Sequence, residues 1–433
     1  MIQKLPLPLL ADADVVIAGG GPSGFAAAIA AARTGGKVLL LEQFTMLGGL
    51  GTAGLVPMFA PASDGERMIY GGIFAEINVE MCRRMGVAVD SGSWQAINPE
   101  ILKRLLDEMA EAAGIRYVFG AKVCEAEVEG GRVSALLVAT SNGLRRVTGR
   151  TFIDATGDAL LAMLCGAEFD YGDESGKTMS PTLCAQFSNI DFAAYETACR
   201  AGASDRAVWH KMTAEGKAPL QEHHFVCMKP VSAASAGSNL GHIYGLDTLD
   251  EFELTRGYVE GRRIARIMEE FYRDHIPGFQ RAELLTTAPL LGVRETRRIR
   301  GEYRMTFEDY NRRAVFADEI GRCSYPVDIH SGSTDPEEQK KVERVMSETQ
   351  FKHGESYGIP YRAMIPKGIA NLLVPGRALS ADRAIQSSLR VMPPCFVTGQ
   401  AAGAAAVLAK GDVREVDTVQ LRTRLAGMGA FFK

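Results

Sequence analysis

Apolar and polar positions in the N-terminal part of the chain predict a strand, a helix and a second strand. A short apolar run over residues 14–18 is typical of a buried β-strand, and the Ala-rich segment up to about Thr34 is typical of a helix. Gly35 and Gly36 end that helix, and the run "KVLLLE" predicts a second buried strand ending at Glu42. This order indicates a βαβ unit in a parallel sheet.

Two further patterns follow this unit. The segment "NPEILKRLLDEMAEAAG" predicts an amphipathic helix with Asn98 as its N-cap and Pro99 in its first turn. Residues 115–157 alternate apolar and polar positions between Gly-Gly and Asn-Gly turns. They therefore predict a β-meander that returns to the parallel sheet.

From about residue 166 the pattern changes to mixed strands and polar loops. Helical spacing of apolar positions predicts a long helix over about 249–274, and the charged segment 335–356 predicts a surface helix. After this segment, an apolar run and an Ala- and Gly-rich stretch return to the composition of the N-terminal part. We therefore expect the middle of the chain to be inserted into a fold that its two ends form.

The glycines between the first strand and the first helix form the pattern GxGxxG. Gly19 permits a tight turn, Gly21 lets the backbone approach a pyrophosphate, and Gly24 lets helix and strand pack closely. The helix N-terminus supplies free N–H groups and a partial positive charge. Glu42, about 20 residues further on, is suited to accept hydrogen bonds from an adenosine ribose. The predicted dinucleotide contacts here are Gly19, Gly21, Pro22, Ser23, Gly24, Glu42 and Gln43.

Two more glycine-containing turns extend this prediction. The loop "FTMLGGLGTAGLVPM" follows the second strand and suits a backbone that passes close to a flat ring and a second phosphate. The segment "GRTFIDATGDALLA" reads as a strand, a turn and a helix, in which Asp158 could equally be an ordinary helix cap. The residues added to the predicted site are Gly49, Thr52, Gly54, Ala155, Thr156, Gly157 and Asp158. The sequence has no second complete GxGxxG, so we expect no separate nicotinamide domain.

Composition narrows the class of protein. A net charge of −4 over 433 residues gives no basic surplus for binding nucleic acid. The apolar N-terminal stretch is short and broken by two prolines, unlike a signal peptide, and no run reaches the roughly 20 apolar residues of a membrane span. We therefore expect a cytoplasmic protein that binds neither nucleic acid nor membrane.

The eight cysteines are scattered and include no CxxC pair. This distribution argues against a metal site or a local dithiol and favours reduced thiols. The adjacent His223 and His224 point in different directions, so we do not expect both to bind one metal ion.

Three sequence blocks resemble the FAD-dependent oxidoreductases of the FAD_oxidored family, within the wider glutathione-reductase and fumarate-reductase-like flavoproteins. They are "GGGPSGFAAA…LLLEQ…LGGLGTAG", "GVRETRRIRGEYRMT" and "YGIPYRAMIPKGIANLLVPGRALSADRAIQSSLRVMPPCFVTGQAAGAAA". The resemblance implies FAD as cofactor and an α/β fold of the GR2 type, in which an α+β substrate domain is inserted into a Rossmann-like domain. The implied parts are an FAD-binding domain over 1–165 and 356–433 and a substrate region over 166–355.

The resemblance also implies roles for further residues. Val123 would contact the adenine through its backbone, and Gly376 and Arg377 would lie near the phosphate and ribitol of FAD. Arg390 and Val391 would form a wall beside the isoalloxazine ring, with Gly399, Gln400 and Ala401 as its floor. We expect Thr398 to cap a helix that starts at Gly399, because Pro393 and Pro394 prevent a helix before Cys395. In this arrangement Cys395 is a packing residue in the turn.

Hydride transfer to or from a flavin requires a group that handles a proton and a charge that orients the substrate. The candidates for catalysis are His330, Tyr361, Arg362 and Arg294. Each also suits a structural role, and the Arg294 segment could be a solvated strand face or an ion-pair network. Together these features predict an enzyme that transfers a hydride between flavin N5 and a small polar, or anionic, organic substrate, with an unidentified electron acceptor.

Two alternatives stay open at this point. One is a non-redox flavoprotein that uses FAD for structure or binding. The other is an NAD-dependent dehydrogenase, which the flavin-type second and third blocks disfavour. The sequence does not identify the substrate, the reaction direction, the oligomeric state or a covalent link to the flavin.

Overall fold

The computed structural model describes residues 7–222, 225 and 228–433. The N-terminal part of the fold is built around a seven-stranded mixed sheet. Its strands are β1 (Leu9–Ala18), β2 (Val38–Leu41), β5 (Arg116–Val118), β6 (Lys122–Glu129), β7 (Arg132–Thr140), β8 (Gly143–Asp154) and β17 (Leu372–Leu373). The order is β5-β2-β1-β8-β7-β6, with β17 also paired to β8. Strands β5, β2, β1, β8 and β17 are parallel, and β6, β7 and β8 form the expected antiparallel meander. The predicted α/β fold with a Rossmann-like core is confirmed.

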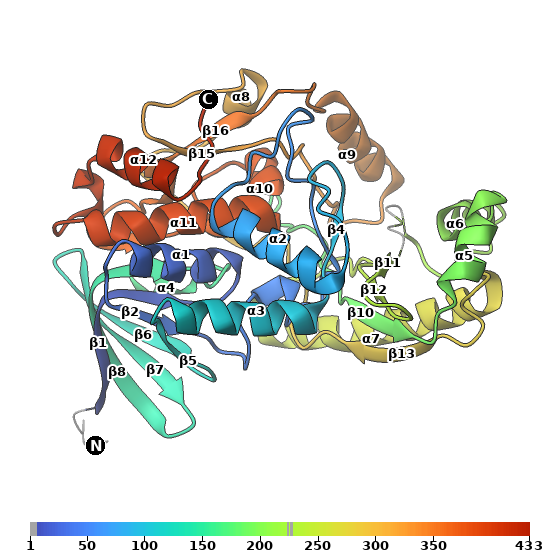
Figure 1. Cartoon of the computed structure of the whole chain (residues 1–433), viewed down its shortest axis with the longest axis horizontal. Coiled ribbons are helices and arrows are strands. Elements are labelled where there is room, and N and C mark those ends of the chain that lie inside the picture. The colour runs from blue at the N-terminus through green and yellow to red at the C-terminus, as the bar shows by residue number, and fades with distance from the viewer. Residues whose placement is uncertain (1–6, 223–224, 226–227) are drawn as a thin grey trace.

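Side chains of β1 alternate between the two faces of this sheet. Val15 and Ile17 belong to the core under α1 (Pro22–Arg33) and α11 (Met392–Leu408), which lie side by side above the sheet in Figure 1. Val16 and Ala18 belong to a separate core on the other face, with α4 (Leu160–Leu164). The strand is therefore buried on both faces, which explains why its sequence is a continuous apolar run.

The start of α11 differs from the expectation. The helix begins at Met392, with Pro393 and Pro394 in its first turn, where a backbone N–H has no intrahelical acceptor. Thr398 is therefore not a cap: its hydroxyl donates within the helix to the Pro394 carbonyl and accepts from the Gly376 N–H at 3.0 Å. The prolines start the helix instead of delaying it.

A second sheet and its helices form a separate hydrophobic core, to the right in Figure 1. The sheet order is β11-β12-β10-β13. Its strands are β10 (Ala185–Ser188), β11 (Lys229–Pro230), β12 (Ala236–Ser238) and β13 (Glu283–Thr287), and its helices are α5 (Phe192–Arg200), α6 (Asp205–Ala214) and α7 (Glu251–His275). Apart from Leu55, the buried members of this core lie between Leu183 and Val293, and we call residues 183–293 the cap.

The remaining elements lie outside these two sheets. Three two-stranded sheets pair β3 (Met58–Phe59) with β4 (Gln95–Ala96), β9 (Phe169–Tyr171) with β14 (Arg297–Ile299), and β15 (Glu319–Cys323) with β16 (Tyr357–Pro360). The helices are α2 (Ile73–Met85), α3 (Pro99–Ala112), α8 (Phe307–Asn311), α9 (Pro336–Glu348), α10 (Arg383–Leu389) and α12 (Thr418–Gly427). Of these helices, α2, α3 and α12 contribute buried residues to the first core. The 3-10 turns are η1 (Gly49–Gly51), η2 (Tyr361–Met364), η3 (Gly376–Ala378) and η4 (Val413–Glu415).

Residues 305–327 pack on the first core, as do residues of β16. The cap core is thus shorter than the predicted substrate region 166–355, and the division into 1–165, 166–355 and 356–433 stays a prediction.

The amphipathic helix after Asn98, the long helix over about 249–274 and the charged helix after residue 335 are present as α3, α7 and α9. Asn98 caps α3 by accepting from the backbone N–H groups of Glu100 and Ile101, and Asp250 and Asp335 cap α7 and α9 in the same way. No single helix in the described part of the chain is long and apolar enough to cross a membrane, although α10 and α11, which meet at 92°, have that length and composition together.

Candidate active site

The GxGxxG turn has the close contacts that its glycines predict. Gly19 has a φ of +97°, and a Cβ atom there would lie 2.5 Å from the Ala155 carbonyl oxygen. A Cβ on Gly24 would lie 1.8 Å from the Gly19 carbonyl oxygen. The N-cap of α1 is Gly21, which has no side chain to occupy the space in front of the helix. The helix N-terminus, with Pro22 and Ser23 as its first residues, is therefore shaped to receive an anion.

Glu42 lies at the carboxyl end of β2, beside this turn. Its buried carboxylate accepts the Gly20 N–H at 2.6 Å and the Phe44 N–H at 2.7 Å. Burial raises the pKa of Glu42, and the backbone donors partly offset that effect. The neighbouring Gln43 is exposed. The Ala121 N–H donates to the Glu42 carbonyl, which brings the start of β6, and with it the buried Val123, close to Glu42.

Three other loops converge on the same turn. A Cβ on Gly49 would lie 2.9 Å from Gly21 Cα, so the second glycine loop meets the first through its backbone. In that loop the Thr52 hydroxyl donates to the Leu47 carbonyl at 2.6 Å, and the Gly54 N–H donates to the Gly49 carbonyl. A Cβ on Gly376 would lie 2.8 Å from Ser23 Oγ.

The turn after β8 is joined to η3 by an ion pair. Arg377 lies 2.8 Å from the Asp158 carboxylate, which also accepts the Thr296 hydroxyl at 2.8 Å. Gly157 lies directly beside the Arg377 guanidinium, and the Thr156 hydroxyl donates to Asp154. The structure thus brings together the predicted dinucleotide residues of the 19–24, 49–54, 155–158 and 376–377 segments.

A cavity of about 790 Å³ lies between these loops and the cap, and we call it the larger cavity. Leu50, Arg377 and the start of α11 form one wall, and the cap contributes Met228, Lys229 and Asn239. The third wall contains Arg294, Asp328 and His330. The positive side chains of the lining outnumber the negative Asp328; they are Arg206, Lys229, Arg294, Arg377 and Arg390.

Arg294 is a buried cation in this wall. Its side chain is held by two neutral acceptors, the Ser180 carbonyl at 2.6 Å and the Thr182 hydroxyl at 3.0 Å. Within the described residues no carboxylate forms an ion pair with it. Burial, and then the nearby Arg390, lower the pKa of Arg294 to about 10, so the side chain stays charged at neutral pH.

His330 lies next to Asp328 in the same wall. Its Nε2 is 3.3 Å from Asp328 Oδ1, and Asp328 Oδ2 lies 2.8 Å from the Arg390 guanidinium and accepts the Tyr325 hydroxyl at 3.1 Å. Burial and the charge of Arg294 lower the pKa of His330 well below its usual value, against the opposing effect of Asp328. The ring is therefore neutral at pH 7 and able to accept a proton.

Two predicted catalytic residues lie elsewhere. Tyr361 is buried in the first core, where its hydroxyl donates to the Val413 carbonyl at 2.8 Å. Arg362 is half-exposed, lies 3.4 Å from Asp318 and is stacked over the Tyr303 ring. Neither residue is part of the cavity lining. Both side chains start from η2 and make their contacts outside this cavity, and the catalytic role expected of them stays a prediction.

The predicted floor of the ring site is also placed differently. Gly399 and Ala401 are buried in the interior of α11, and the Gln400 side chain accepts the Ile73 N–H at 2.9 Å. The helix starts at Met392, so its first turn faces the larger cavity, where we expected Gly399, Gln400 and Ala401. Arg390 and Val391, just before that turn, line the same cavity.

Sequence reasoning missed several residues of the site. Trp94 lines the larger cavity in edge contact with Tyr325, with ring centroids 6.0 Å apart. His242, from the cap, contacts His330, and Glu222 contacts His242, but no spacing or motif marks these two residues in the sequence. No group of three or more His, Cys, Asp or Glu in the described residues could hold a metal ion, and the His223–His224 pair lies outside those residues.

Unpaired polar atoms test whether these residues fit FAD. Within the part of the chain that the structure describes, Arg377 Nε, Arg390 Nε and Gln386 Oε1 are buried without a hydrogen-bond partner. Two of the three side chains line the larger cavity, next to the glycine loops. A cofactor with a phosphate-containing arm and a polar ring would supply acceptors there, so the residues present fit FAD.

Comparisons with known proteins agree with this fit. Residues 14–425 match the family described as FAD dependent oxidoreductase. A search of curated proteins found no match.

Similar solved structures include the flavin-dependent brominase Bmp2 as a triple mutant, which is 14% identical with a TM-score of 0.50 and covers 96% of this chain and 84% of that one. A geranylgeranyl bacteriochlorophyll reductase-like protein from Thermoplasma acidophilum is 13% identical with a TM-score of 0.46 and covers 96% and 83%. At these identities, the likeness to the brominase shows a shared fold and nothing more. The likeness to the reductase-like protein is too low to support an inference.

Proposed function

The chain belongs to the FAD dependent oxidoreductase family, and from this premise we propose that it transfers a hydride between a small anionic organic substrate and bound FAD. FAD is the cofactor, and the chain is a flavin-dependent redox enzyme. The finer proposal concerns the kind of substrate and the groups that bind it.

The environment of Arg294 is the observation from which we infer an anionic substrate. Among the described residues, the hydrogen bonds to this buried guanidinium come from neutral oxygens, which leave its desolvation uncompensated, and a carboxylate of the substrate would compensate it. Arg206 and Lys229 add positive charge to the same lining. The mixed polar and apolar walls, with Trp94 and Tyr325, suit a small organic skeleton.

Residues around the glycine loops would hold the cofactor. The N-terminus of α1 would bind its pyrophosphate, Glu42 its ribose, and Arg390 with the first turn of α11 would lie along its ring. When bound, FAD supplies a two-electron acceptor or donor for the substrate carbon.

In this proposal His330 handles the proton. Oxidation of a carbon that bears a hydroxyl or amino group removes a hydride from that carbon and a proton from the oxygen or nitrogen, and a double bond forms between the two atoms. His330 would accept this proton, because its ring is neutral and lies in the cavity wall beside Asp328. In the reverse direction the same ring would return the proton.

The test is anaerobic reduction of the FAD-loaded protein, followed as loss of absorbance near about 450 nm. The panel consists of short 2-hydroxy and 2-amino carboxylates, each paired with its neutral methyl ester. We expect one or more carboxylates to bleach the flavin, and the matching ester to do so at least about 10-fold more slowly, because it lacks the ion pair.

Arg294→Gln should remove this preference, and Arg294→Lys should keep part of it. Arg200→Gln, an exposed change on α5, is the matched control and should behave as the wild type. Equal rates for acid and ester would overturn the assignment of an anion. A flavin that reduces photochemically but responds to no acid or ester would favour the non-redox alternative.

A further inference from the structure

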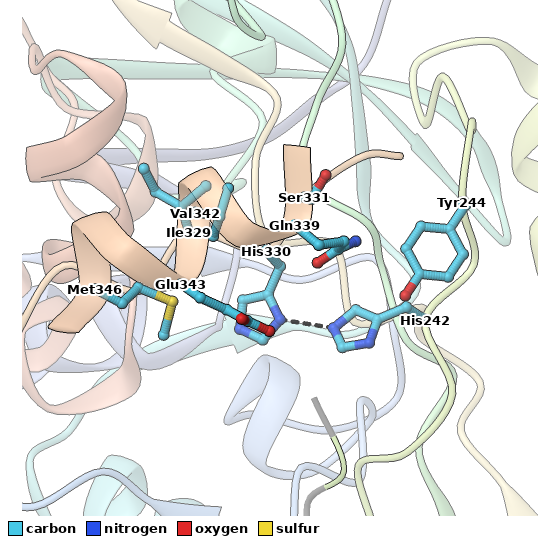
Figure 2. Close-up of a pocket in the computed structure, with 9 residues that line it drawn as sticks. All are labelled: His242, Tyr244, Ile329, His330, Ser331, Gln339, Val342, Glu343 and Met346. Atoms are coloured by element: carbon cyan, nitrogen blue, oxygen red, sulfur yellow. Dashed lines mark hydrogen bonds between the residues drawn. The ribbon is translucent and has the colours of Figure 1, made fainter. Parts of the chain in front are cut away.

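A continuous row of polar side chains connects the cap with the start of α11. The Glu222 carboxylate lies 2.8 Å from His242 Nδ1, and His242 Nε2 lies 2.6 Å from His330 Nδ1, as Figure 2 shows for the two rings. His330 Nε2 then faces Asp328 at 3.3 Å, and Asp328 pairs with Arg390 at 2.8 Å. All four side chains from Glu222 to Asp328 are nearly buried, with exposed fractions of 2, 6, 9 and 12% along the row.

With both rings neutral, the hydrogen positions in this row follow from the Glu222 carboxylate. We assign a hydrogen to His242 Nδ1, because its partner is the Glu222 carboxylate, which in its ionised form only accepts. A neutral His242 therefore has its lone pair on Nε2, which accepts the Nδ1–H of His330. In a neutral His330 the remaining lone pair is on Nε2, the nitrogen on the Asp328 side. The resting pair thus has its basic nitrogen at that end of the row.

His330 separates two cavities. Together with Asp328 it lines the larger cavity, which we assign to the substrate. With His242 it also lines a smaller cavity of about 40 Å³ under α9, whose other lining residues include Gln339 and Glu343 (Figure 2). Glu343 is exposed, so the smaller cavity leads to solvent, whereas His242 is absent from the lining of the larger one.

We propose that His330 and His242 form a proton relay that connects the larger cavity with the smaller cavity under α9. This inference rests on the proposed function, which places a proton-releasing substrate next to His330. The substrate proton binds His330 Nε2, and the Nδ1 proton of His330 moves over 2.6 Å to His242 Nε2. The pair then holds one extra proton between Glu222 and Asp328. The Nδ1 proton of His242 moves to the Glu222 carboxylate, both rings then carry their hydrogen on Nε2, and Glu222 releases the proton to solvent beside the smaller cavity that His242 lines. No electrons move in these steps, and one proton enters for each that leaves.

The charges around His330 and His242 favour passing the extra proton on, and not holding it on one ring. Burial and Arg294 lower the pKa of His330, so the extra proton does not stay on that ring. The two carboxylates at the ends of the row stabilise the charged pair while the proton passes. Among the residues that the structure describes, the titratable and charged groups around the pair and its two carboxylates are Glu222, Tyr244, Arg294, Tyr325, Asp328, Glu343 and Arg390.

The first test measures the coupling of the two rings without turnover. The FAD-loaded protein is labelled with ¹⁵N-histidine, and the ring nitrogens of its seven histidines are followed by NMR as a function of pH. We expect the signals of His242 and His330 to change together in the wild type and in His210→Gln, an exposed control on α6. In His242→Gln, His330 should titrate alone with a different midpoint. An unchanged midpoint would overturn the relay.

The second test measures proton transfer during anaerobic flavin reduction by the carboxylate that is active on the wild type. His242→Gln should slow reduction by about 10-fold and increase its solvent isotope effect, while His210→Gln changes neither. Glu222→Gln, which loosens the Nδ1–H contact of His242, should act in the same direction if His242→Gln does not fold. Wild-type rates and isotope effects in both variants would overturn the relay. Absence of reduction in the wild type itself would instead contradict the proposed function, and the NMR coupling would still decide whether the rings share a proton.

Discussion

Gly399 of α11 lies directly against Ser23 of α1: a Cβ atom on Gly399 would stand 2.0 Å from the Ser23 carbonyl oxygen. Gly403 and Ala27 make the same kind of contact one turn later, also at 2.0 Å. The two helices therefore meet through their backbones at Ser23, in the first turn of α1 directly after the dinucleotide turn. Gly399 positions α1, and through it the candidate phosphate site, from within the protein core.

Replacing Gly399 by alanine should destabilise the fold. The added methyl group must push α1 and α11 apart, which typically costs about 1–3 kcal/mol in a well-packed core. The measurement is the free energy of unfolding from urea titration of the FAD-free protein. Gly427→Ala in α12 is the control, because no described atom lies within 4 Å of its added Cβ. A Gly399→Ala protein as stable as wild type would contradict the backbone contact.

Glu42→Gln should weaken FAD binding by about 10-fold or more. The carboxylate accepts two backbone N–H groups, and an amide would present its own NH2 to one of them. The dissociation constant follows from the quenching of FAD fluorescence when apoprotein is added. Glu76→Gln, which removes an exposed ion pair with Arg33, should leave the constant unchanged. Equal affinities for both variants would remove Glu42 from the binding site.

Cys395 should be unreactive in the folded protein. Burial raises the pKa of its thiol to about 12, and its Sγ lies 3.3 Å from the Arg390 carbonyl. We expect an aromatic disulfide reagent to modify the exposed Cys124 first and Cys395 only on unfolding. Cys395→Ser should keep FAD and turnover, with stability changed by no more than about 1 kcal/mol, because the hydroxyl retains a donor. Loss of turnover with FAD retained would instead give the thiol a chemical role.

The buried pair of Arg322 and Glu319 makes stability depend on pH when one partner is removed. The two side chains are 2.8 Å apart and essentially unexposed. Burial raises the pKa of Glu319, and Arg322 opposes that effect. In Arg322→Met the folded-state pKa should rise further above its unfolded value, so the protonated form fits the core and stability falls as the pH rises through that pKa.

We therefore expect Arg322→Met to cost about 3–5 kcal/mol at pH 8 and clearly less at pH 5.5, measured by urea unfolding. Exchanging both partners, as Arg322→Met with Glu319→Gln, should recover part of the loss and remove the added pH dependence. A loss that is equal at both pH values would show that Glu319 does not become an unpaired charge.

The strand, turn and helix at the GxGxxG pattern could be predicted because their determinants are local. Gly19, Gly24 and the apolar runs on both sides lie within one strand–helix unit, where the spacing of residues sets which backbone atoms meet. Helix caps such as Asn98 and Asp250 act on residues two or three positions away, so they too can be predicted from sequence. Pro393 and Pro394 misled the prediction, because a proline ends a helix in its interior and begins one in its first turn.

The sequence by itself therefore determined the fold class, the cofactor-binding unit and the identity of His330 and Arg294 as candidates. Only the tertiary structure decided that His330 meets His242, 88 residues away in the chain, and that Tyr361 and Arg362 point elsewhere. A titratable side chain takes its protonation state and its partner from groups that packing brings within a few ångströms. Such contacts join separate elements of the cap and the sheet, and no periodicity within either element records them.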